Sequence, residues 1–241
     1  PQNRWGTGAL QELDQPPILA PVSKLARTIP TAGDVVAGMH EAFVVAGSSH
    51  RGPVFVDVPM DELFNAGAGT LPDITVARGA DPDTDALAEI AGLLGGAERP
   101  VLILGTDVWA DRAEEAALRF VEATGVPAIT NGMGRGVVPG GHPLLVTKAR
   151  SQALGNADLV VVVGTPLDFR LNYGTFGGRD GAAPARVVHV ADSPDQLAGH
   201  ASLAGSVSGD LTAVFDGLLA ALEQVDRRPD RSAWVADLQA A

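Results

Sequence analysis

Four aspartates follow short apolar runs, at points where a carboxylate could accept hydrogen bonds from ribose hydroxyls or an adenine amino group: Asp107, Asp168, Asp192 and Asp210. The carboxyl ends of parallel strands meet at one edge of a sheet, so we expect these acids to lie along that edge. Each could instead cap a helix, and Asp210 before LTAVF is the best candidate for a cap. As a set, the acids favour a ligand-binding edge.

Two segments share the pattern of an apolar run, Gly-Thr and an aspartate. They are VLILGTD at residues 101–107 and VVVVGTPLD at residues 160–168, and Arg170 follows two positions after Asp168. An apolar run that ends in glycine is a common way for a strand of an open α/β sheet to turn. It is also where such sheets bind ligands, beyond the strand ends. Both interpretations stay open on these residues.

The glycine-rich loop GMGRGVVPGG at residues 132–141 does not match a dinucleotide fingerprint, because its spacing is G-x-G-x-G and no acid follows about 20 residues later. The chain also has no G-x-x-x-x-G-K-[ST], which excludes a nucleoside triphosphate P-loop. The loop offers main chain that can approach a ligand closely, with Arg135 beside it, or else a tight turn that requires glycine.

Side chains for catalysis are not grouped in a recognisable motif. The five histidines show no metal-ligand spacing, no G-x-S-x-G is present, and the acids Glu114 and Glu115 fall on a solvated helix face. His189 lies inside the run RVVHV and is expected to be a hydrogen-bonded core residue. By its own residues the chain is therefore interpreted as a binding domain, with no catalytic residue and no metal ligand assigned.

The elements that must position these residues alternate from about residue 82 to residue 225. Apolar residues at three-four spacing predict helices over residues 83–97, 112–125, 148–157 and 211–225, and short apolar runs predict strands within residues 99–107, 126–136, 158–168 and 185–193. Such alternation predicts crossover units on a parallel sheet with helices on both faces, which is an α/β, Rossmann-like fold.

Residues 1–64 have a different organisation. They contain a predicted helix over residues 31–47, with Asp34 as N-cap and Gly47 as C-cap, and a predicted strand that stops at Pro59. One helix and one strand cannot cover both faces of a sheet, so this stretch is interpreted as the C-terminal part of another α/β domain. The Ala-, Gly- and Pro-rich residues 65–81 are typical of a linker, and residues 226–241 are assigned to the start of a further linker.

Charge and composition exclude several classes of function. A formal net charge of −12 argues against nucleic acid, whose binding depends on basic side chains that neutralise phosphates. No apolar run reaches the roughly 18 residues that a membrane span needs. The chain has no cysteine, which excludes disulfides and thiolate metal sites and makes a reducing cytoplasm the simplest location.

Five segments in order, PQNRWGTGALQELD, RGPVFVDVP, PAITNGMGRG, VVVGTPLDFR and VVHVADS, resemble the large subunit of acetolactate synthase and its thiamine-diphosphate-dependent relatives. The resemblance covers nearly the whole chain and includes 2-hydroxyacyl-CoA lyase-like and benzaldehyde lyase-like proteins. It implies that residues 1–64 end an N-terminal pyrimidine-binding domain and that residues 82–225 are the central domain. The third, diphosphate-binding domain would be missing.

The resemblance also implies a nucleotide site in the central domain, which carries FAD in acetolactate synthases and ADP or part of CoA in oxalyl-CoA decarboxylase relatives. Gln11 matches a glutamine that lines the substrate channel. Pro166 stands where the family often has an arginine, and Met60 where it often has a lysine, so FAD, an adenine nucleotide and an empty site remain alternatives. The implied cofactor contacts are Arg51, Gly105, Thr106, Asn131, Gly132, Met133, Gly164, Thr165, Asp168, Asp192, Gly209 and Asp210.

For the intact enzyme, the resemblance implies decarboxylation and carboligation of a 2-keto acid such as pyruvate with thiamine diphosphate and Mg²⁺, in branched-chain amino-acid biosynthesis, by a homodimer or homotetramer. The family's activating glutamate and its Gly-Asp-Gly metal motif are not found in these residues, so this chain alone is expected to be inactive and monomeric. The alternatives are a 2-hydroxyacyl-CoA lyase, oxalyl-CoA decarboxylase or benzaldehyde lyase-like activity, and a non-catalytic nucleotide-binding module. A sirtuin-like NAD-binding domain is disfavoured, because zinc-binding cysteines are absent.

Overall fold

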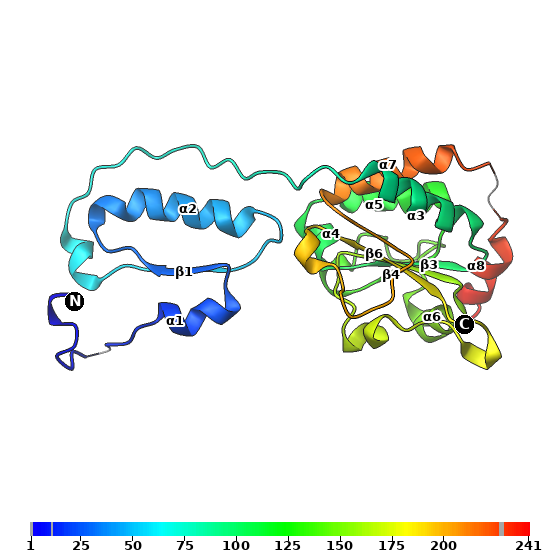
Figure 1. The fold of residues 1–241 in the computed structure, drawn as a ribbon, viewed down its shortest axis with the longest axis horizontal. Coiled ribbons are helices and arrows are strands. Elements are labelled where there is room, and N and C mark those ends of the chain that lie inside the picture. Colours follow the sequence, from blue (N-terminus) through cyan, green and yellow to red (C-terminus); the bar gives the residue numbers. More distant parts are fainter. Residues whose placement is uncertain (1, 11, 227–228) are drawn as a thin grey trace. The chain divides into compact units, whose positions relative to one another are not determined.

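The computed structural model describes residues 2–10, 12–226 and 229–241. The chain divides into two compact units, Pro1–Arg78 and Gly79–Ala241 (Figure 1). Residues 65–83, between the last short helix of the first unit and the first helix of the second, form no helix or strand. In the part of the chain that is described, no helix has both the length and the apolar character that crossing a membrane would require.

The first unit contains two parallel strands connected by a helix. Strand β1 (Leu25–Thr28) pairs with β2 (Val54–Asp57), and α2 (Val35–Gly47) lies between them in the chain. The predicted helix and strand are therefore confirmed, whereas β1 was not predicted. Asp34 stands at the N-cap position of α2 without a side-chain cap bond; its carboxylate accepts from Thr31 Oγ1 at 2.6 Å. The short helix α1 (Pro16–Leu19) precedes β1.

The second unit is built on a five-stranded parallel sheet. Its strands are β3 (Pro100–Leu104), β4 (Ala128–Thr130), β5 (Leu159–Val163), β6 (Arg186–Ala191) and β7 (Gly205–Ser208), in the spatial order β4-β3-β5-β6-β7. The chain places β4 on one side of β3 and then crosses to the other side for β5, so the strand order reverses between β3 and β5. Open α/β sheets bind ligands at such a switch point, beyond the carboxyl ends of the strands.

Helices cover both faces of this sheet (Figure 1). On one face, α3 (Thr84–Gly96), α5 (Glu114–Thr124) and α7 (Leu211–Glu223) pack against alternate strand residues such as Leu102, Leu104 and Val161. On the other, α6 (Arg150–Asn156) and α8 (Ser232–Gln239) pack against the intervening residues such as Ile103 and Val162. This burial on both faces explains why the strands are continuous apolar runs, and the predicted α/β fold is confirmed.

The predicted helices of the second unit agree with the structure to within a few residues at either end. Gly125 adopts φ 64° and ends α5, as a C-terminal glycine does in the left-handed region. Unpredicted elements are α4 (Thr106–Ala110), β7 and α8. The described residues also contain short 3-10 helices: η1 (Gln2–Arg4), η2 (Ala20–Val22), η3 (Ala32–Asp34), η4 (Met60–Phe64), η5 (Gly132–Gly134), η6 (Thr147–Ala149), η7 (Phe169–Gly174, interrupted by a kink), η8 (Arg179–Gly181) and η9 (Pro194–Gln196).

Candidate functional site

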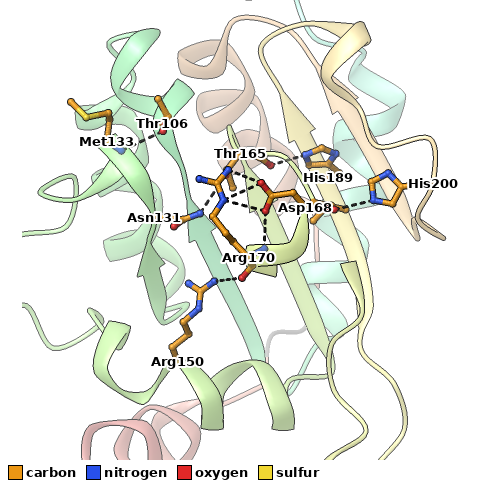
Figure 2. A network of polar contacts seen from close by, with 10 residues as sticks. Thr106, Asn131, Met133, Arg150, Thr165, Asp168, Arg170, His189 and His200 are labelled. Carbon is orange, nitrogen blue, oxygen red and sulfur yellow. Dashed lines mark hydrogen bonds and ion pairs between the residues drawn. The ribbon is translucent and has the colours of Figure 1, made fainter. Parts of the chain in front are cut away.

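Three loops follow the carboxyl ends of β3, β4 and β5, beside the point where the strand order reverses; we call this group of loops the crevice (Figure 2). Main-chain hydrogen bonds join the loops: Gly105 N–H donates to Val163 O at 2.8 Å, and Asn131 N–H donates to Leu104 O at 2.8 Å. The two segments with the same sequence pattern thus lie side by side as β3 and β5. The crevice brings together eight of the residues selected from the sequence: Gly105, Thr106, Asn131, Gly132, Met133, Gly164, Thr165 and Asp168.

Glycine is required where these loops approach one another. A Cβ on Gly105 would lie 2.3 Å from Gly164 O, and one on Gly134 would lie 2.4 Å from Leu104 O. Gly132 has φ +55°, and its Cβ would lie 2.4 Å from Thr106 Oγ1. The glycine-rich loop therefore needs its glycines partly for tight packing against β3, which was one of the two interpretations of its sequence.

Polar groups line the crevice from each loop (Figure 2). Met133 N–H donates to Thr106 Oγ1 at 3.3 Å, and Asn131 Nδ2 donates to Thr165 Oγ1 at 3.4 Å. Met133 is 53% exposed, whereas Thr165 is buried. The arrangement offers hydroxyl and amide groups beside one accessible apolar side chain, which suits a ligand with both polar and flat apolar parts.

Asp168 and Arg170 form a close ion pair in the loop after β5. Arg170 Nε and Nη2 donate to Asp168 Oδ2 at 3.0 and 2.6 Å, and Arg170 N–H donates to Asp168 Oδ1 at 2.9 Å. These bonds lower the pKa of the Asp168 carboxyl below its ordinary value and raise the pKa of the Arg170 guanidinium. Asp168 is thus an ionised acceptor rather than a proton donor, and its contact with a cofactor remains a prediction.

The other three acids have different surroundings. Asp107 in α4 and Asp192 after β6 are both buried, with carboxylate oxygens within 4.8 Å of each other. Asp210 follows the edge strand β7, and its Oδ1 accepts from Ala213 N–H at 3.0 Å. The capping role proposed for Asp210 is confirmed. Gly209 and Asp210 lie at the end of β7, two strands away from β5, and their contact with a cofactor remains a prediction, as does that of Asp192.

Two further predicted residues do not belong to the described part of the second unit. Arg51 belongs to the first unit and stands shortly before β2, and its contact with a cofactor remains a prediction. Gln11 falls outside the residues that the structure describes.

Two histidines bind main-chain carbonyls of the loop after β5 (Figure 2). His189 is 1% exposed; its Nδ1 accepts from Ala198 N–H at 3.1 Å, so the Nε2–H donates to Thr165 O at 3.1 Å. His200 Nε2 lies 2.9 Å from Leu167 O. The core role predicted for His189 is confirmed. The role of His200 gave no sequence signal, because its partner is a main-chain atom 33 residues away.

The buried His189 is expected to make folding pH-dependent. Burial lowers the pKa of its imidazole from the ordinary value of 6.5. As the pH falls through about 6.5, the unfolded chain therefore takes up a proton that the folded chain does not bind. The free energy of unfolding is highest above this pH and decreases as the pH falls, by at most about 1.4 kcal/mol per pH unit. Urea unfolding from about pH 8 to about pH 5 should show a smaller loss for His189→Gln, which keeps a donor but cannot titrate. An unchanged slope would contradict this assignment.

Comparison with known proteins defines the class to which this arrangement belongs. Residues 87–218, which contain most of the second unit, match the family model described as the central domain of thiamine pyrophosphate enzymes. The chain belongs to the thiamine pyrophosphate enzyme family. A Mycobacterium smegmatis protein whose X-ray structure is described as that of a thiamin diphosphate-dependent enzyme shares the fold, with a TM-score of 0.65 and 24% identity over 91% of this chain and 43% of that chain.

Within the family, the chain is similar to acetolactate synthases and to two kinds of CoA-thioester enzyme. It is 40% identical to the acetolactate synthase large subunit of Mycobacterium tuberculosis, over 100% of this chain and 43% of that protein. It is 35% identical to a rice 2-hydroxyacyl-CoA lyase, over 70% of this chain and 32% of that protein. It is 30% identical to oxalyl-CoA decarboxylase of Escherichia coli, over 90% of this chain and 39% of that protein. The chain therefore spans less than half the length of these relatives.

Proposed function

We propose that residues 79–241 are the central domain of an acetolactate synthase-like, thiamine-diphosphate-dependent enzyme that acts on a 2-keto acid. The observation that carries this proposal is the 40% identity over the whole chain to an acetolactate synthase large subunit, against 35% and 30% over shorter stretches to the two CoA-thioester enzymes. A lyase or decarboxylase acting on acyl-CoA is the second candidate, because those relatives also match.

The crevice supports a nucleotide as the ligand of this domain. It lies at the switch point of a parallel sheet and combines the hydroxyl of Thr106, the amide of Asn131 and the exposed side chain of Met133. These groups fit an adenine nucleotide or FAD: the carboxylate of Asp168 can accept from ribose hydroxyls, and Met133 can contact a flat ring. Pro166 is exposed at the same edge and adds no charge for a diphosphate.

The residues at the end of β7 do not fit the family's metal-diphosphate motif. In Gly209-Asp210-Leu211 the third residue is not glycine, and the Asp210 carboxylate caps α7. We therefore assign no Mg²⁺ ligand there. Thiamine diphosphate, when bound by the whole enzyme, supplies the electron sink for 2-keto acid decarboxylation, and we infer that residues beyond these 241 bind it.

Titration of the 241-residue chain with ADP and with FAD tests the nucleotide proposal. We expect saturable binding of at least one of the two by calorimetry, since both carry the adenine and ribose that the crevice fits. Binding of ADP without FAD would favour the acyl-CoA class of relative, and binding of FAD the acetolactate synthase class. Failure of both ligands to bind would contradict the assignment of the crevice.

Turnover separates the role of this chain from that of the whole enzyme. We expect carbon dioxide release from pyruvate by the natural full-length polypeptide with thiamine diphosphate and Mg²⁺, and none by the 241-residue chain. Release from oxalyl-CoA but not from pyruvate would replace the first candidate by the second. We further propose that the whole enzyme is cytoplasmic and forms a homodimer or homotetramer. Sedimentation of the same preparation measures its oligomeric state.

A further inference from the structure

A cavity lies between α6 and the segment from Arg170 to Arg179, which follows the crevice residue Asp168 in the chain. Its volume is about 520 Å³. Three arginines line it, Arg150 from the start of α6, Arg170 from the loop after β5, and Arg179, which begins η8. The rest of its wall is apolar or uncharged and includes Leu154, Phe176 and Asn172. No role was assigned to Arg150 or Arg179 from the sequence.

The arginines are fixed in place by hydrogen bonds that leave most of their donors for a ligand. Arg150 Nη2 donates to Arg170 O at 3.0 Å, and Arg179 Nη2 donates to Ser151 Oγ at 2.9 Å. A guanidinium has five N–H donors in a planar fork, and each of these bonds uses one. Gly155 allows Arg179 to lie against α6, because a Cβ there would be 2.9 Å from Arg179 Nε.

The charge of this wall is opposite to that of the whole chain. None of the residues that line the cavity is acidic, although the chain has a formal net charge of −12. Asp168 lies outside the lining and pairs with Arg170. Among the contacts that the structure describes, Arg150 and Arg179 have no acidic partner, and burial lowers the pKa of Arg150. Arg150 and Arg179 therefore bring two positive charges to one cavity, one of them partly desolvated, and an anion in the cavity would neutralise them.

We propose that this cavity binds a phosphate-bearing anion, with Arg150 and Arg179 as its principal ligands and Arg170 between it and the crevice. Guanidinium forks match phosphate oxygens in pairs, and phosphate carries more charge and more acceptor oxygens than a single carboxylate. The cavity is larger than one phosphate group, so the anion is expected to be a diphosphate or the phosphate end of a larger ester. This inference does not depend on which nucleotide occupies the crevice.

Inorganic pyrophosphate is the probe for this site. We expect it to bind the 241-residue chain in calorimetry at low salt, with an affinity that falls as salt is added. Arg150→Gln and Arg179→Gln should each weaken binding roughly tenfold or more, because each removes charge-assisted hydrogen bonds to the anion. Arg99→Gln is the matched control: Arg99 is an exposed arginine just before β3, at the amino ends of the strands, and its loss should leave the affinity unchanged.

Four outcomes would overturn the proposal. The first is that millimolar pyrophosphate does not bind, and the second is that Arg99→Gln weakens binding as much as the cavity variants do. The third is that Thr106→Ala, a change in the crevice, abolishes pyrophosphate binding while the cavity variants retain it, which would place the anion in the crevice. The fourth is that succinate, a dicarboxylate, binds with the same affinity as pyrophosphate, which would exclude a site that prefers phosphate groups. Thermal melting of every variant establishes that it folds, so a lost affinity reports on the site.

Discussion

Replacing Gly134 by alanine is expected to destabilise the second unit and to abolish nucleotide binding in the crevice. The new Cβ would lie 2.4 Å from Leu104 O and 2.7 Å from Gly105 O, and both oxygens are main-chain atoms at the end of β3, a strand paired on both sides. A main chain inside a parallel sheet cannot move as a side-chain tip can, so the η5 loop must shift away from β3. Such overpacking costs about 1–3 kcal/mol. Urea unfolding measures this loss, and titration with ADP and FAD measures binding.

The same loop provides a matched control. A Cβ on Gly140 would meet nothing within 4 Å, and this glycine has no positive φ, so Gly140→Ala should keep both stability and binding. It could add up to about 1 kcal/mol, since alanine restricts the unfolded chain. Equal effects of the two substitutions would mean that the loop needs flexibility rather than close approach. A Gly134→Ala variant that binds normally would exclude the packing of η5 on β3 as the origin of the crevice.

Predictions from periodicity succeeded where the core determines the pattern. The helices α3, α5 and α7 each place an apolar stripe against the sheet, and the three-four spacing of Leu87, Ile90 and Leu94 follows directly from that burial. The strands β3 and β5 are buried on both faces and are therefore continuous apolar runs. In these elements the local pattern and the tertiary environment require the same residues.

The missed elements are those that tertiary contacts specify. Strand β7 has the sequence Gly-Ser-Val-Ser, with low strand propensity, and it forms because β6 offers a free edge to pair with. Strand β1 contains Arg27 and has only four residues, and it pairs with β2. Helix α4 is a five-residue turn directly after Gly105. None of these segments has a period long enough to detect in the sequence.

Only part of the candidate site could be predicted from the sequence, because only some of its residues stand at strand ends. The glycines and threonines after β3 and β5 could be placed, because strand ends are visible in the sequence and parallel strands meet at one edge. The positions of Arg150 and Arg179 could not be inferred, since their proximity depends on how α6 packs beside the segment before β6. Asp210 could be a cap or a ligand contact on sequence grounds, and only the bond to Ala213 N–H establishes the cap.

Residues 226–241 were assigned to a linker, and the described part of this stretch has a different structure. Residues 232–239 form α8, and Trp234 and Leu238 are buried in the core on the α6 face of the sheet. Arg231 precedes α8, and its guanidinium donates to the carbonyls of Leu94, Ala97 and Thr124, near the carboxyl ends of α3 and α5. Cationic donors are favourable at helix carboxyl ends. We therefore propose that the central domain extends through α8.

Trp234→Ala is the sharpest test of that boundary and is expected to have the largest effect on stability. Trp234 is 7% exposed, packs in the core, and donates from Nε1 to Pro100 O at 3.1 Å, at the start of β3. Truncating a buried tryptophan costs about 3–5 kcal/mol, a large share of the stability of a domain of this size. Urea unfolding followed by circular dichroism measures the loss without relying on tryptophan fluorescence.

The chain contains its own control for this substitution. Trp109 in α4 is 52% exposed, so Trp109→Ala should cost far less than Trp234→Ala. Trp234→Phe keeps a buried ring but removes the bond to Pro100 O, which separates packing from a hydrogen bond worth about 1 kcal/mol. If residues 226–241 were a linker that the sheet does not need, both alanine variants would unfold at the same urea concentration as the wild type. A midpoint lowered only by Trp234→Ala would place α8 inside the cooperative unit that carries the crevice.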